Sequence, residues 1–294
     1  VFKFDQDLVQ LSSDQFDGGY GAPDSSLGAA APTSTDVYLG GAYYNGSNYE
    51  GLVLKRSLPL GVGGGDGSTF SGDFSAAGGA RFDGGFGDDG NGVVVDTVTV
   101  GGPFVYTVGW SSHGSTLDAF VIKYNASGIK IASATYVSNV GGHMSFSAGA
   151  QDAALDASGN LLVASIRNDL AGAAGLGRDV VVVKFSPSLA VISSVTVGDP
   201  GGVHVEGWAV AVHPSGDIYV TGKSSGNPSV TPDPADALLL KFNSGLVLQA
   251  SVTFNGSGNG HDSWYELATA LDGNIIVAGE THGTDADVWI AKFN

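Results

Sequence analysis

The sequence predicts an all-β fold, a five-bladed β-propeller of four-stranded antiparallel blades, because one short phrase recurs along the chain. The phrase is an acidic residue, four mostly apolar residues and a lysine, and it is typical of a β-strand. Its copies begin at Glu50, Asp118, Asp179, Asp236 and Asp287. The lysines lie 51 to 68 residues apart, counting Lys3 as part of a sixth copy, and such a period indicates a propeller. No stretch shows the period of an amphipathic helix.

The fourth copy shows the order of elements most clearly. A run at 189–197 follows the preceding lysine, and a Gly-rich loop leads to a short alternating run at 208–212. A turn at 215–217 precedes the run at 218–222, and the lysine phrase at 236–242 completes the unit. Glycine beside Asn or Asp supplies the positive φ of a tight hairpin. Each repeat therefore predicts four short strands.

We expect the two ends of the chain to complete one blade together. The run Leu8–Ser13 matches the strand that follows each lysine phrase, and the chain ends just after the phrase at 287–293. Pairing between these two segments would close the propeller and protect its sheet edges. We therefore predict a single domain over residues 1–294, with repeats at approximately 4–56, 57–124, 125–185, 186–242 and 243–294.

Composition narrows the classes of partner. The formal net charge is -17, which disfavours nucleic acid and anionic membranes and favours cations or neutral polar ligands. The absence of cysteine excludes disulfides and thiolate metal sites. No apolar run is long enough to be a transmembrane segment. A glycan or a protein partner is therefore expected.

Several segments resemble the SBBP-type β-propeller repeat of bacterial surface and secreted proteins. The resemblance is carried by AVHPSGDIYVTG (211–222), ALDASGNLLVAS (154–165), DAFVIKYNASG (118–128) and DALLLKFNSG (236–245). It covers the third to fifth repeats well, whereas the first two lack the Gly-Asn turn. The resemblance implies a propeller in an extracellular or cell-surface setting, and it supplies no catalytic residues.

Three histidines indicate a candidate site before the alternating runs. His143, His204 and His261 each lie 20 residues after a repeat lysine. In one interpretation they hold a divalent metal or a ligand at the top face near the central channel. In the other, which we favour, each histidine caps the loop of its own blade, because a repeated residue is usually duplicated with its structural role.

Acidic and aromatic residues surround these histidines. Glu206, Asp262 and Trp264 are candidate ligand-binding residues, because an aromatic ring beside carboxylates suits a sugar. Trp208 and Tyr265 occupy equivalent positions and are interpreted as packing residues, which makes Trp264 the better candidate for exposure.

A Gly-rich acidic stretch in the second repeat is a candidate for Ca²⁺ or another divalent cation. Asp83, Asp88 and Asp89 would supply its oxygen ligands. The spacing is not that of an EF-hand, and we favour a solvated acidic turn over a metal site.

Catalytic signatures are sparse. The sequence has no phosphate-binding loop of the GxxxxGK[ST] type and no GxSxG nucleophile motif. The leading hypothesis is therefore a non-enzymatic, extracellular binding or assembly module. One alternative is a metal- or carboxylate-dependent hydrolase, glycosidase-like, using Asp24, Glu206 and Asp262 at the channel mouth. The other is a purely structural component of a surface assembly.

Overall fold

The computed structural model contains 21 β-strands and no helix in the part of the chain that it describes. Consequently, no helix among those residues is long and apolar enough to cross a membrane. The described residues are 2–4, 10–13, 25–32, 36–44, 47, 49–57, 80–82, 87–113, 116–137, 149–169, 177–198, 204–225, 235–256, 260–282 and 285–294.

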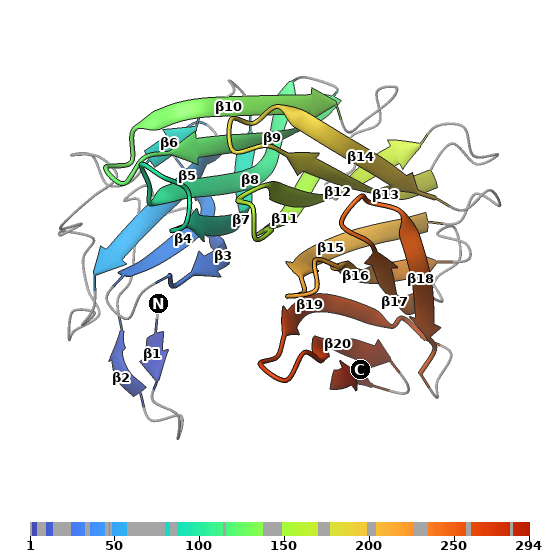
Figure 1. Ribbon diagram of the computed structural model, residues 1–294. Helices are drawn as coiled ribbons and strands as arrows, with labels where there is room; N and C mark the ends of the chain where they lie inside the picture. The colour runs from blue at the N-terminus through green and yellow to red at the C-terminus, as the bar shows by residue number, and fades with distance from the viewer. Residues whose placement is uncertain are drawn as a thin grey trace. The chain divides into compact units, whose positions relative to one another are not determined.

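Five antiparallel sheets, called blades 1 to 5, have their strands in chain order and confirm the predicted class, a five-bladed β-propeller (Figure 1). Blade 1 comprises β3 (Ser25–Ala30), β4 (Asp36–Tyr44), β5 (Tyr49–Ser57) and β6 (Ala80–Phe82). Blade 2 comprises β7 (Asp88–Asp96), β8 (Phe104–His113), β9 (Thr116–Tyr124) and β10 (Lys130–Val137).

The other three blades repeat this order. Blade 3 comprises β11 (Gly149–Leu155), β12 (Leu161–Asp169), β13 (Gly177–Phe185) and β14 (Val191–Val197). Blade 4 comprises β15 (His204–Val212), β16 (Ile218–Ser225), β17 (Ala235–Phe242) and β18 (Leu248–Phe254). Blade 5 comprises β19 (Ser263–Thr269), β20 (Ile275–His282) and β21 (Ala286–Phe293).

The chain divides into two compact units. One contains residues 1–114 and 121–133, and the other contains 115–120 and 134–294. Blades 3 to 5 lie wholly in the second unit, which holds the candidate site described below. The predicted single domain and its repeat boundaries stay predictions.

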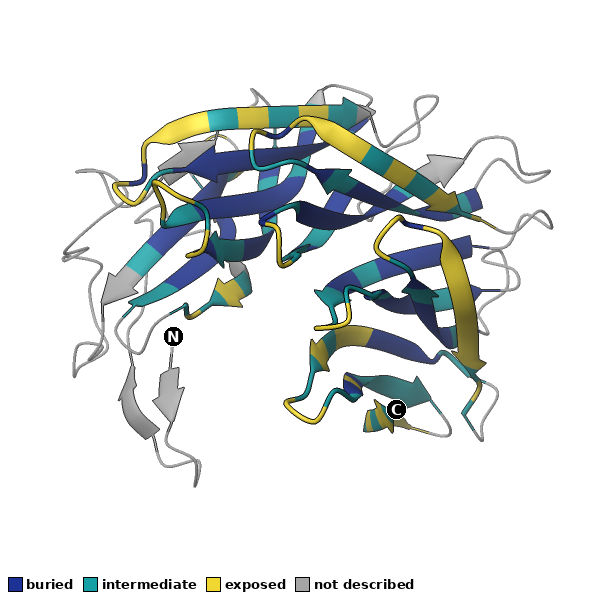
Figure 2. Cartoon of the chain, in the orientation of Figure 1, coloured by how far each residue is buried: buried dark blue, intermediate teal, exposed yellow. Residues whose placement is uncertain are grey.

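Within the second unit, the middle strands of the blades carry the core and the last strands face solvent (Figure 2). Val180 and Val182 of β13 pack with Leu238 and Leu240 of β17 in one buried cluster. The lysine phrases in β13 and β17 therefore form central strands that are buried on both faces, which explains their nearly continuous apolar sequence. The phrase in β21 lies at the edge of blade 5 and is largely exposed. In contrast, β14 and β18 are largely exposed.

The predicted tight turns are confirmed in blades 3 to 5. Gly159, Gly216 and Gly273 have φ values of 76°, 90° and 82°. Each glycine N–H donates to the carbonyl three residues earlier at 2.8 to 2.9 Å. Only glycine adopts such a positive φ without steric cost, so the turn glycine fixes the hairpin between the first two strands.

The repeated lysine has a partner that the sequence pattern did not reveal. In four blades its Nζ forms an ion pair with an aspartate at the turn between the first two strands. The pairs are Lys55–Asp36 at 3.2 Å, Lys184–Asp156 at 2.9 Å, Lys241–Asp217 at 3.0 Å and Lys292–Asp272 at 2.6 Å. The third strand is thereby tied to the hairpin that precedes it.

We expect Asp156→Ala to lower the free energy of unfolding by about 1–2 kcal/mol, because Asp156 also accepts from the Ser158 and Asn160 N–H groups. Burial raises the pKa of Asp156, but bonds from Asn160 and Lys184 outweigh it and hold the pKa below its ordinary value. The depressed folded pKa means that this contribution is present above pH ~4 and is lost as the pH falls through the folded pKa. Urea denaturation at neutral pH and at pH 3 measures both effects. Asp272 is exposed, so Asp272→Ala is the matched control. If Asp272→Ala lowered the free energy of unfolding as much as Asp156→Ala does, the account would be contradicted.

The predicted pairing of the two ends is not observed. The segment β2 (Gln10–Ser13) pairs with β1 (Phe2–Phe4), with Lys3 opposite Ser12. β13 and β17 pair in the same way with the strands that follow them, with Lys184 opposite Ser193 and Lys241 opposite Ala250. A local hairpin costs less loop-closure entropy than a pairing across the whole chain. Among the described strands, none pairs with the outer edge of β21, where Val288 is 85% exposed.

Candidate functional site

A β-bulge occurs at the same place in the first strand of every blade. The register shifts by one residue at Ser26/Gly28, Gly90/Gly92, Ala150/Asp152, Gly207/Ala209 and Trp264/Glu266. The extra residues are Leu27, Asn91, Gln151, Trp208 and Tyr265. A bulge bends its strand and redirects the side chain of the extra residue. In blades 2 to 5, where the side chain of the extra residue is described, the fold thus redirects one residue per blade at equivalent positions.

Glycine opposite the bulge makes room for it in blades 4 and 5. A Cβ on Gly222 would lie 1.7 Å from the carbonyl oxygen of Glu206, and one on Gly279 would lie 1.9 Å from that of Ser263. Neither distance is possible for a real side chain. The close approach of the neighbouring strand at the bulge therefore leaves no room for a Cβ at Gly222 or Gly279, whereas Ser165 occupies the equivalent position in blade 3.

The bulges of blades 4 and 5 bring two aromatic rings together. Trp208 and Tyr265 are stacked with ring centroids 4.5 Å apart and planes inclined by 2°. Tyr265 is 41% exposed, and Lys223 Nζ lies 5.7 Å from the centroid of a Trp208 ring. This stacked pair, and not Trp264, forms the aromatic surface of the site.

The prediction that Trp264 is the exposed aromatic is wrong. Its side chain is fully buried and packs on Trp289 and Phe254, with ring centroids 5.4 and 6.4 Å away. The bulge at Tyr265 explains the error, because one extra residue reverses the alternation of inward and outward side chains. Tyr265, interpreted from the sequence as a packing residue, takes the exposed position.

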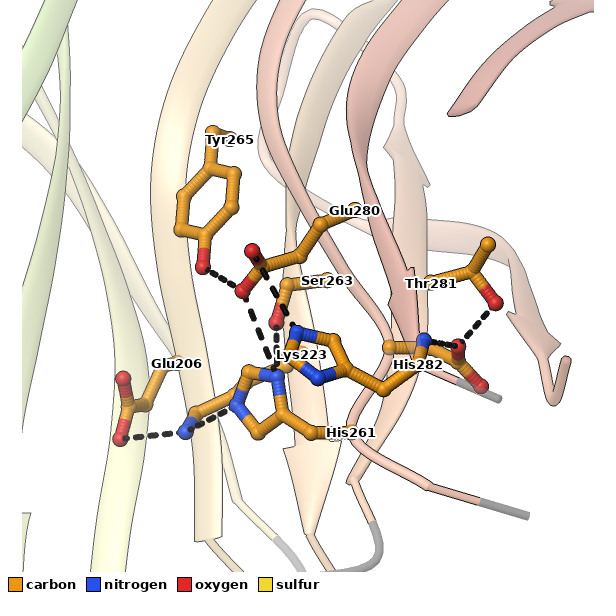
Figure 3. A network of polar contacts seen from close by, with 9 residues as sticks. Glu206, Lys223, His261, Ser263, Tyr265, Glu280, Thr281 and His282 are labelled. Carbon is orange, nitrogen blue, oxygen red and sulfur yellow. Dashed lines mark hydrogen bonds and ion pairs between the residues drawn. The ribbon is translucent and has the colours of Figure 1, made fainter. Parts of the chain in front are cut away.

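Next to the stacked pair, His261, Glu280 and His282 form a compact polar cluster (Figure 3). His261 precedes β19, while Glu280 and His282 end β20 two positions apart, on the same face of the strand. His261 Nδ1 lies 3.6 Å from Glu280 Oε1, and His282 Nε2 lies 3.4 Å from Glu280 Oε2. Among the described His, Cys, Asp and Glu residues, this is the one group close enough to hold a metal ion together.

Tyr265 connects this cluster to the aromatic pair. Its hydroxyl donates to Glu280 Oε1. That bond and the two histidines lower the pKa of Glu280 against the opposing effect of burial. Burial and the same bond raise the pKa of Tyr265. Glu280 is therefore held as an anion, and the ring of Tyr265 is fixed in orientation.

Blade 4 supplies one cation, Lys223, to the same cluster. Lys223 Nζ on β16 lies 3.2 Å from His261 Nε2 and 4.0 Å from Glu206 Oε1. Glu206 is 2% exposed and also pairs with Arg178 of β13. The predicted site residue Glu206 thus serves as a buried counter-ion for two cations.

Asp262 has a structural role. It is fully buried, and its carboxylate accepts from Gly256 N at 2.6 Å, Thr281 Oγ1 at 2.5 Å and His282 N at 3.2 Å. These bonds join the loop before β19 to the end of β20. Asp262 therefore positions His261 and His282 without being available to a ligand itself.

The remaining predicted residues are not brought together. His143, Asp83 and Asp24 lie outside the described residues. His204 is buried at the start of β15, and it is not part of the cluster of His261, Glu280 and His282. Asp88 and Asp89 are consecutive in regular pairing with β8, so their side chains point to opposite faces of the blade. The calcium loop and the metal shared by three histidines stay predictions without geometric support.

Two further carboxylates have raised pKa values. Burial raises the pKa of Asp152 to about 7, although the N–H groups of Val210 and Ala153 lower it, and the charge of Glu266 adds to the increase. Burial also raises the pKa of Glu266, part of which remains exposed. These two residues, rather than Glu206 and Asp262, have the raised carboxyl pKa values that general acid–base chemistry uses.

Sequence reasoning missed Lys223, Glu280, His282 and Arg178. Lys223 and Glu280 each follow the glycine opposite a bulge, Gly222 and Gly279. A glycine followed by a charged residue near the end of the second strand is therefore a sequence motif that could have identified Lys223 and Glu280 as site residues. Its meaning depends on the bulge, which the sequence does not display.

Comparisons with known proteins give no family. No family model matches the chain, and no curated protein does. Solved structures of similar fold include an endo-arabinase from Bacteroides thetaiotaomicron, with 11% identity, TM-score 0.44 and coverage of 92% of this chain and 93% of that one. An α-L-arabinofuranosidase from Fusarium graminearum has 8% identity, TM-score 0.44 and coverage of 91% and 93%. A Synechocystis apocarotenoid oxygenase mutant has 8% identity, TM-score 0.44 and coverage of 91% and 57%. These values are too low for those activities to be transferred to this chain.

Proposed function

We propose that this chain is a non-enzymatic binding module that holds a glycan against the stacked pair Trp208–Tyr265. The supporting observation is the pair itself, which is partly exposed and stands beside charged hydrogen-bonding groups. An aromatic face packs on the C–H patch of a sugar ring, while neighbouring polar groups bind its hydroxyls. The extracellular setting implied by the repeat resemblance is part of the proposal.

The pair is organised before the ligand arrives. Tyr265 is held at its hydroxyl by Glu280, and Trp208 is covered by Tyr265 on one face. Ordering a side chain on binding costs roughly 0.5–1.5 kcal/mol, and a ring that is already fixed avoids that cost. Lys223, whose Nζ lies 5.7 Å from a Trp208 ring, can donate hydrogen bonds, and the exposed Glu266, which follows Tyr265 in β19, can accept them.

A glycan array followed by calorimetry tests the proposal. We expect the wild-type protein to bind a subset of neutral oligosaccharides, and Trp208→Ala and Tyr265→Ala each to weaken the best-bound one at least about tenfold. Tyr265→Phe keeps the ring but loses the bond to Glu280, so its loss should be smaller. Tyr49→Ala is the matched control, because Tyr49 is similarly exposed at 38% and lies beside another tyrosine, but outside the site.

Either of two results would contradict the proposal: no bound oligosaccharide on the array, or affinity unchanged in both Trp208→Ala and Tyr265→Ala. The same assay addresses the hydrolase alternative, which the raised pKa values of Asp152 and Glu266 favour. Cleavage of the bound sugar that disappears in Asp152→Asn or Glu266→Gln would replace the binding module with a glycosidase.

A further inference from the structure

We propose that His261, Glu280 and His282 form a binding site for one divalent transition-metal ion of the Zn²⁺ type, and that Lys223 is an internal cation that competes with the metal. The site shares only His261 with the three-histidine ring considered from the sequence, and it has no residue in common with the calcium loop. It does not depend on glycan binding.

The ligand atoms are close to the spacing that a metal requires. A tetrahedral ion with bonds of about 2.0–2.1 Å separates neighbouring ligand atoms by roughly 3.4 Å. The separations to the two oxygens of Glu280 are 3.6 Å from His261 Nδ1 and 3.4 Å from His282 Nε2. One ligand atom from each of the three residues lies within 4.8 Å of the others. Small side-chain rotations therefore suffice to close the site.

The donor set selects the class of ion. Two imidazoles and one carboxylate suit Zn²⁺ and its first-row neighbours, whereas Ca²⁺ takes six to eight oxygen ligands. Three protein ligands leave a fourth position for water or another small ligand. All three side chains are partly exposed, at 24%, 32% and 38%, so the cluster lies at the surface of the protein.

Surrounding residues orient the ligands as outer partners do in metal sites. Asp262 accepts from the backbone N–H of His282 and from Thr281, which fixes the end of β20. Tyr265 donates to Glu280. The Nε2 atom of His282 is buried and meets no hydrogen-bond criterion within the described residues. Its neighbour is Glu280 Oε2, at 3.4 Å. An ion between them would supply a partner.

Lys223 opposes the metal through hydrogen bonding and charge. Its ammonium can only donate, so at 3.2 Å the Nε2 atom of His261 is the acceptor. The proton of a neutral His261 is then on Nδ1, the atom facing Glu280. Metal binding at Nδ1 requires the proton to move to Nε2, where it opposes Lys223. The lysine must turn away, and Glu206, whose Oε1 is 4.0 Å from Nζ, is the anion beside it.

Titration of Zn²⁺ and Co²⁺ into the chelator-treated full chain tests the proposal by calorimetry, the visible spectrum of Co²⁺ and the melting temperature. We expect one ion per chain, with a rise in melting temperature that chelator reverses. His282→Ala and Glu280→Gln should each weaken binding at least about tenfold, because each removes a ligand. Lys223→Met should strengthen it by about tenfold, because a competing cation is removed while the aliphatic bulk stays.

His213→Ala is the control, because His213 bonds the Gly273 carbonyl in a turn far along the strands and should leave affinity unchanged. Circular dichroism establishes that each variant is folded. The metal site is overturned if neither the wild type nor Lys223→Met binds an ion, or if affinity survives in both His282→Ala and Glu280→Gln. Equal affinities of the wild type and Lys223→Met would overturn the competition. Because no glycan is present, these outcomes are independent of the proposed binding function.

Discussion

Gly222→Ala is expected to destabilise the protein by about 3 kcal/mol or more, which is at the upper end for a single substitution. The added Cβ would lie 1.7 Å from the carbonyl oxygen of Glu206 and 2.7 Å from its carbon. Both are backbone atoms, so no side-chain rotation relieves the overlap, and β15 and β16 must separate at the bulge. Urea denaturation measures the loss, and the stacking of Trp208 on Tyr265 should be lost with it.

Gly245→Ala provides the comparison. Gly245 lies in an exposed turn, where an added Cβ would meet only the Asn243 side-chain oxygen at 3.4 Å. The change in unfolding free energy should stay within about 1 kcal/mol. If Gly222→Ala were as mild as Gly245→Ala, the bulge would not require glycine opposite it, and the account of how the site is built would be wrong.

The second large effect is expected at Asp262. Asp262→Ala should cost about 3 kcal/mol, because it leaves the buried donors Gly256 N, Thr281 Oγ1 and His282 N without their acceptor. Asp262→Asn should cost less, since one acceptor oxygen remains. Thermal and urea unfolding report both losses.

The exposed Asp285→Ala serves as the reference for removing one negative charge. A loss of stability confined to about 0.5 kcal/mol in Asp262→Ala, or equal to that of Asp285→Ala, would show that the carboxylate does not hold the loop before β19 to β20. The metal affinity should fall in Asp262→Ala as well, because two ligands sit on the segments that Asp262 joins.

The repeat made much of the fold predictable. The lysine phrases became the third strands of their blades, and the turn glycines of blades 3 to 5 have the expected positive φ. Both features are local, since apolar alternation and turn chemistry act over a few residues. The predicted pairing of the first segment with the last strand is not observed. β2 matches two equivalent lysine strands, β1 and β21, and the sequence pattern does not choose between them.

The candidate site was less predictable for a physical reason. A bulge adds one residue to a strand and reverses the alternation beyond it, so Trp264 and Tyr265 exchanged their expected environments. The metal-competent cluster joins His261 to Glu280 and His282, which are neighbours only after β19 pairs with β20. Lys223 comes from another blade, and such a contact depends on how blades pack.

A crystal structure of the protein soaked with its best-bound oligosaccharide tests the central claim most directly. The account predicts a sugar ring packed on the exposed face of the Trp208–Tyr265 pair, with hydroxyls bonded to neighbouring charged side chains. A sugar bound at another place in the chain, with the aromatic pair unoccupied, would contradict it.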